Sequence, residues 1–124
     1  MLYSILIYGD EDRVAAWTPE EDQEVMGRHA ELRRDLTAGQ RLGPVMRLEA
    51  NAAKIVRRYK DRNYITDGPF TETKEQLMGI YVIDCPAFED AIAATERLSF
   101  ESNVFVIRPV TWLSPGVIPP THPE

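Results

Sequence analysis

Three segments of this chain carry apolar side chains on both of their alternating faces, and this pattern constrains the fold more than any other feature. They span residues 2–8, 78–83 and 104–110 and are rich in β-branched and aromatic residues, which favour strands. A strand that faces water on one side alternates apolar with polar residues, whereas a strand buried on both faces does not. The sequence therefore predicts a sheet with two apolar faces.

Two helices are expected between these strands. Thr18 can cap the first helix, Pro19 suits its first position, and acidic residues follow in its first turn. This helix is expected to end near Ala38, with Gly39 as a left-handed stop. Its apolar stripe would consist of Val25, His29, Leu32 and Leu36, with Met26 beside it. Pro86 is expected to open a second helix with one apolar face made of Phe88, Ala91, Ile92, Thr95 and Leu98.

The middle of the chain is expected to add a hairpin. Residues 42–49 and 53–59 read as its two strands, and Gly43-Pro44 favours an edge position for the first. A short helical turn is expected over residues 72–76. The order of elements predicts an α+β fold, a ferredoxin-like βαββαβ plan with an extra hairpin. The domain would span residues 1–113, followed by a proline-rich tail over residues 114–124.

In this plan both helices cover one face of an antiparallel sheet and leave the other face bare. Because the strands are apolar on both sides, the bare face needs a cover, and one chain of 124 residues has no further element to supply it. We therefore expect a homodimer in which two sheets pack face to face.

Composition narrows the function classes. No apolar run approaches the ~20 residues of a membrane span, and a net charge of −6 disfavours direct binding to nucleic acid or to an anionic membrane. Cys85 is the only cysteine, which fits a reducing cytoplasm and a half-buried structural role rather than a catalytic thiol. Residues 41–62 are locally basic, and the residues alone leave open a solvated hairpin face or an anion site.

His29 is the first candidate for chemistry. A buried imidazole needs a hydrogen-bond partner and can titrate near neutral pH, so it could be structural or functional. Lys74 could neutralise an anionic substrate and Glu72 could relay protons, although both could also solvate a short helix. The hydroxyl of Tyr81 could line a pocket, although core packing is the preferred interpretation of Tyr81. With two histidines far apart and no acid cluster, no metal site is expected.

The run Asp67-Gly68-Pro69-Phe70-Thr71-Glu72-Thr73-Lys74-Glu75-Gln76-Leu77 resembles the core motif of the DGPF branch of the YCII-related proteins, which are small bacterial domains. The resemblance implies a dimeric α+β barrel. It also implies a functional histidine in the first helix, at His29, paired with an aspartate. The aspartate segment of the broader group is replaced here by residues 98–101, so Asp67 is the expected partner, although an Asp before Gly-Pro can simply close a turn.

Two functions follow as hypotheses. The first is a small cofactor-independent enzyme in which His29 and Asp67 transfer protons on a small anionic or aromatic metabolite. Its substrate site would include Phe70, Glu72, Lys74 and Tyr81. The second is a non-catalytic ligand-binding or regulatory module linked to extracytoplasmic-function sigma factors, as the resemblance suggests. A stable dimer without a pocket stays open as well. No cofactor is expected, because no phosphate-binding glycine loop follows a strand and opens a helix.

Overall fold

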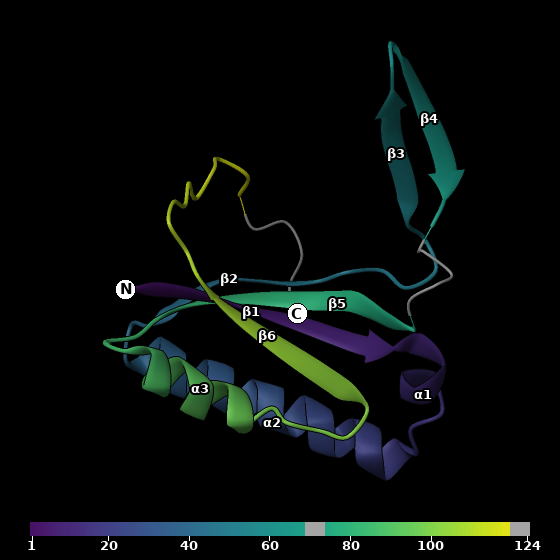
Figure 1. Cartoon of the computed structure of the whole chain (residues 1–124). Coiled ribbons are helices and arrows are strands. Elements are labelled where there is room, and N and C mark those ends of the chain that lie inside the picture. Colours follow the sequence, from purple (N-terminus) through teal and green to yellow (C-terminus); the bar gives the residue numbers. More distant parts are fainter. Residues whose placement is uncertain (69–73, 120–124) are drawn as a thin grey trace.

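The computed structural model describes residues 1–68 and 74–119 and forms a layered α+β fold (Figure 1). The main layer is a four-stranded antiparallel sheet in the order β2-β5-β1-β6. Its strands are β1 (Leu2–Asp10), β2 (Leu42–Arg47), β5 (Glu75–Asp84) and β6 (Asn103–Pro109). Helices α2 (Pro19–Ala38) and α3 (Phe88–Glu96) cover one face. The strand order is consistent with the ferredoxin-like plan, and the α+β prediction is confirmed.

The core lies between the sheet and these two helices. Alternate residues of β1 and β5 point into it, so that Ile5 and Ile83 are fully buried. The other buried members of this cluster are Tyr3, Ile7, Leu32, Leu36, Tyr81, Cys85, Ala91, Ala94 and Leu98. The intervening residues of β1 lie on the opposite face of the sheet and are half-buried. The helices therefore cover one face, as expected from the element order.

Helix α2 begins and ends where the sequence predicts. The Thr18 side chain accepts a hydrogen bond from the Glu21 amide, and the Glu21 carboxylate accepts one from the Thr18 amide. The predicted left-handed stop at Gly39 is wrong, because Gly39 has a φ of −86°. Gln40 adopts the left-handed conformation instead, with a φ of 57°, and the next amide, of Arg41, returns to the Leu36 carbonyl.

The predicted hairpin pairing is wrong. Strand β2 pairs with β5, while β3 (Lys54–Tyr59) pairs with β4 (Arg62–Asp67) in a separate two-stranded sheet. A two-residue loop joins β3 to β4, and its first residue, Lys60, has a φ of 56°. Lys-Asp is not the usual sequence of such a loop, and β4 was therefore not expected as a strand. The predicted edge position of β2 is confirmed.

Smaller differences concern the ends of elements. Helix α1 (Glu11–Ala15) was not expected, and it forms because the Asp10 carboxylate accepts hydrogen bonds from the Asp12 and Arg13 amides. Helix α3 begins two residues after Pro86. The helical turn expected over residues 72–76 is wrong at Glu75 and Gln76, which start β5. In the described part of the chain, no helix is long and apolar enough to cross a membrane.

Candidate functional site

His29 lies on the face of α2 that packs against the sheet. Val25 and Leu32, four residues before it and three after it, are both buried, and residues at this spacing share one face of a helix. The imidazole itself is half-buried. His29 therefore faces the sheet, as the helical periodicity predicted, and its ring lies at the edge of the core.

Tyr81 meets this imidazole from the sheet. It lies on β5 next to the central strand β1, opposite Ile5, and only 2% of it is exposed. Its hydroxyl oxygen is 2.7 Å from Nδ1 of His29, and the ring centroids are 5.7 Å apart. Because a buried phenol normally finds a hydrogen-bond partner, this contact fixes the orientation of both side chains.

Two arginines add positive charge around the pair. Arg33 follows His29 by one helical turn on α2, and Arg47 lies on β2 opposite Gly79, which precedes Tyr81 by two residues on β5. The pKa of His29 is lowered from 6.5 to about 4, chiefly by burial, and the charges of Arg33 and Arg47 contribute to this fall. His29 is therefore neutral at physiological pH.

A neutral imidazole in this contact can either accept or donate a proton at Nε2, depending on which nitrogen carries the hydrogen. When Nδ1–H donates to the Tyr81 oxygen, Nε2 is free to accept a proton. When the Tyr81 hydroxyl donates to Nδ1, Nε2 carries a hydrogen that it can donate. An anion bound beside Arg33 and Arg47 would offset their charges and raise the pKa of His29 back toward its ordinary value of 6.5. Anion binding and proton uptake would thus favour each other.

The structure does not bring Asp67 to His29. Asp67 is the last residue of β4, is about 85% exposed and forms an ion pair with Lys54 of β3. In the described residues, the hydrogen-bond partner of His29 is Tyr81, so Tyr81 orients the imidazole here. Lys74 is exposed immediately before β5. Phe70 and Glu72 lie outside the described residues.

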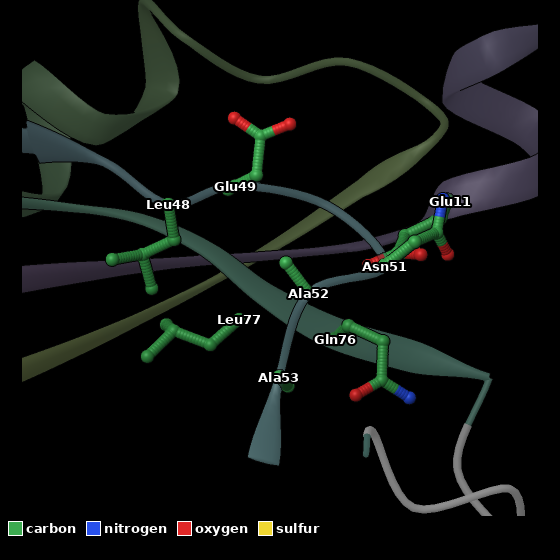
Figure 2. A pocket seen from close by; sticks show the side chains of 8 residues that line it. All are labelled: Glu11, Leu48, Glu49, Asn51, Ala52, Ala53, Gln76 and Leu77. Atoms are coloured by element: carbon green, nitrogen blue, oxygen red, sulfur yellow. The ribbon is translucent and has the colours of Figure 1, made fainter. Parts of the chain in front are cut away.

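A shallow cavity of about 410 Å³ lies elsewhere, at the junction of α1, the connection from β2 to β3, and the start of β5. Figure 2 shows the side chains of Leu48 and Leu77 on one side of it and those of Glu11, Asn51 and Gln76 on the other. Its lining residues are Glu11, Leu48, Glu49, Asn51, Ala52, Ala53, Gln76 and Leu77. None of the predicted site residues that the structure describes lines it, and it borders the base of the β3–β4 hairpin.

The surroundings of Cys85 do not favour a nucleophilic thiolate. It is buried between β5 and α3 and was expected to be half-buried. Burial raises the pKa of its thiol, and the nearby carboxylate of Asp90 raises it further, so the unreactive protonated form is favoured. Within residues 1–68 and 74–119, no group of three or more His, Cys, Asp and Glu side chains is arranged to hold a metal ion.

Sequence reasoning named His29 and Tyr81 as candidates but did not select the two arginines. The spacing of Arg33 from His29 is one helical turn, which is a readable signal. Arg47 belongs to the basic segment for which an anion site was one interpretation. What the sequence could not give is the pairing of β2 with β5, which places Arg47 on the same face as Tyr81.

Comparison with known proteins agrees with the fold. Residues 1–114 match the YCII-related domain family. The chain is also 38% identical over 123 residues to an uncharacterized protein of Rhizobium meliloti (strain 1021), and the match covers 96% of this chain and 99% of the relative.

Proposed function

We propose that this chain, which belongs to the YCII-related family, binds a small organic anion and transfers a proton to or from it through His29. The observation that carries the proposal is the 2.7 Å contact between Nδ1 of His29 and the Tyr81 hydroxyl, with Arg33 and Arg47 nearby. The arginines would hold the anion, and His29 would act as general base or general acid. Tyr81 is a positioning residue that keeps the ring in place.

The charge arrangement favours carboxylates. A guanidinium group matches the two oxygens of a carboxylate. Proton removal from a carbon next to a carbonyl leaves an enolate, and positive charges near the developing oxyanion lower the barrier to its formation. Within the described residues Arg47 makes no ion pair, so its charge is available to a ligand. An isomerisation or an elimination on a small carboxylate fits this arrangement, and neither needs a cofactor.

The first test uses NMR to detect ligand binding directly. The His29 ring signals are titrated with pH, alone and with each of a set of 2-oxo and unsaturated carboxylates, using the neutral amides as controls. We expect a carboxylate that binds to raise the pKa of His29, and the Arg47→Gln variant to lose this response. Arg34→Gln, a change at an exposed arginine on the same helix as His29, is the matched control. A pKa that no carboxylate moves would contradict the anion site.

The second test asks about chemistry. Carboxylates that bind are incubated in D2O, and loss of the proton signal at the acidic carbon reports proton exchange without knowledge of the full reaction. His29→Gln should abolish the exchange, and Tyr81→Phe should slow it with a smaller effect on binding. Binding without exchange would favour the alternative function, a non-catalytic ligand-binding or regulatory module connected to extracytoplasmic-function sigma factors.

We also propose that two copies pair through the sheet face that the helices leave uncovered. Large apolar side chains on this face support the proposal, including Met46, Val104 and Val106, which are each about 40% or more exposed. Light scattering at micromolar concentration should give twice the chain mass of 14.1 kDa. A monomer mass would exclude the pairing and leave the His29 site unaffected.

A further inference from the structure

The hairpin of β3 and β4, residues Lys54–Asp67, stands apart from the rest of the molecule and is called the arm below. It forms its own two-stranded sheet, and it projects from the body on the side of the main sheet that α2 and α3 leave uncovered (Figure 1). Of its residues, Ile55 alone is half-buried and all others are exposed. Since an isolated two-stranded hairpin is only marginally stable in water, a contact that covers the arm would stabilise it.

Both faces of the arm carry large apolar or aromatic side chains. Val56 and Ile65 are cross-strand partners on one face and are 64% and 69% exposed. Tyr59 and Tyr64 lie on the other face and are also exposed. Exposed apolar side chains that gather on one element mark an interaction surface. Tyrosine and arginine, both present here, are enriched at such surfaces.

The charge of the arm is opposite to that of the rest of the chain. Its five basic and two acidic residues give it a net charge of +3, and since the whole chain carries −6, the remaining residues carry −9. The arm of one copy is therefore attracted to the body of another copy. Charge complementarity of this kind orients a specific contact and speeds its formation.

The uncovered side of the sheet also has a surface that suits the arm. The cavity at the base of the arm combines the acids Glu11 and Glu49 with the apolar side chains of Leu48 and Leu77 (Figure 2). Leu77 lies near the start of β5 and pairs with Tyr8 of β1, so this cavity lies at one end of the inner strands of the main sheet. The apolar and acidic groups there complement the apolar and basic groups of the arm.

We propose that the arm docks onto a second copy of this chain, along the rim of its uncovered sheet face, and that the two copies exchange this contact reciprocally. A two-fold axis makes such a contact occur twice. Each arm would therefore bind the partner next to the cavity at the base of the partner's own arm. The proposal rests on the pairing of sheet faces proposed above and does not depend on the chemistry at His29. It gives the basic segment of the sequence a role in assembly.

The first experiment measures dimer dissociation by analytical ultracentrifugation. In the Arg58→Glu/Arg62→Glu variant we expect the dissociation constant to rise about tenfold or more in low salt, because two attractive charges become repulsive. Salt should reduce the difference between variant and wild type. Arg34→Glu, at an exposed position of α2, is the charge-reversal control away from the arm and should leave the constant unchanged. Circular dichroism checks that each variant is folded.

The second experiment locates the contact. A photoreactive benzoylphenylalanine replaces Ile65 at the middle of β4, and the irradiated protein, mixed with isotope-labelled wild-type chain, is analysed by mass spectrometry. We expect inter-chain adducts within the partner's residues 6–11, 46–53 or 76–80. The same probe at Ala30, exposed on α2, should give no such adduct.

Each outcome decides a different point. A monomeric wild-type chain overturns both the arm contact and the sheet pairing. A dimer that the double reversal does not weaken, together with no adduct from position 65, overturns the arm contact alone. Binding of a fluorescein-labelled 20-base oligonucleotide that needs Arg58 and Arg62, with no change in dimerisation, would assign the arm to nucleic acid and also overturn the proposal.

Discussion

The main sheet and the arm are built from similar residues but differ in what surrounds them. Ile83 in β5 is fully buried, whereas Ile65 in β4 is 69% exposed, although both are β-branched residues within strands. The main sheet has helices on one face, whereas among residues 1–68 and 74–119 no helix or sheet covers the arm. A strand-forming sequence therefore predicts a strand but not the layer to which that strand belongs.

The largest expected contrast is in the free energy of unfolding. Ile83→Ala removes buried methyl groups and leaves a cavity in the core, so we expect a loss of about 2–5 kcal/mol. Ile65→Ala changes an exposed position and should cost less than about 0.5 kcal/mol. Urea denaturation at a fixed low protein concentration measures both. A large loss from Ile65→Ala would mean that the arm is covered even in the dilute protein.

The pH dependence of stability tests the burial of His29 against the main sheet, in contrast to the exposed arm. The pKa of His29 falls from 6.5 to about 4 on folding, so between these values the unfolded chain binds more protons than the folded one. Stability from this group is complete above pH 6.5 and is lost as pH falls toward 4. Because solvent screens the half-buried ring, we expect a loss of roughly 1–2 kcal/mol.

The control for this pH effect is His29→Gln. Carboxylates elsewhere titrate in the same range in both proteins, so the difference between the two stability curves isolates His29. If the two curves run parallel from pH 7 to pH 4, then burial and the arginines do not lower the pKa of His29.

Tyr81→Phe tests the contact that joins helix to sheet. The substitution keeps the ring and removes the hydroxyl that bonds Nδ1 of His29, so a loss of about 1 kcal/mol is expected. Tyr64→Phe, in the exposed arm, is the matched control and should be neutral. Urea denaturation at pH 7 compares the two, and equal effects would show that the hydrogen bond adds nothing to stability.

The smallest effect is expected at Asp67. Its ion pair with Lys54 is exposed on both sides, and such pairs contribute about 0–1 kcal/mol. Asp67→Asn should therefore change the thermal midpoint by a few degrees at most and leave the NMR titration of His29 unchanged. A shift in the His29 titration would show that Asp67 acts on the imidazole after all, as the motif resemblance first suggested.

Much of the fold could be predicted because helix caps and apolar periodicity depend only on residues close together in the sequence. The capping box at Thr18 and Glu21, the apolar periodicity of α2 and the two-sided apolar strands each led to the correct element. The prediction failed where a choice of partner decides the outcome. Residues 42–47 pair with β5 rather than with the next strand, and no local signal distinguishes these two pairings.

The candidate site shows the same division. The position of His29 on the inward face of α2 followed from helical spacing. Its partner did not, because the motif resemblance pointed to Asp67 and the structure supplies Tyr81. Gly43 shows how close the packing is where β2 meets β5, since a Cβ at this position would lie 2.8 Å from the Val82 carbonyl oxygen.

The sequence by itself determined α2, α3 and most of the strands, the inward face of these two helices and the apolar character of both sheet faces, because these depend on neighbours along the chain. Only the tertiary structure decided that β3 and β4 leave the body as an arm and that Tyr81 meets His29. It also decided that two arginines from different elements surround them. These outcomes depend on strand pairing between residues far apart in sequence, where the free energy comes from burying surfaces together.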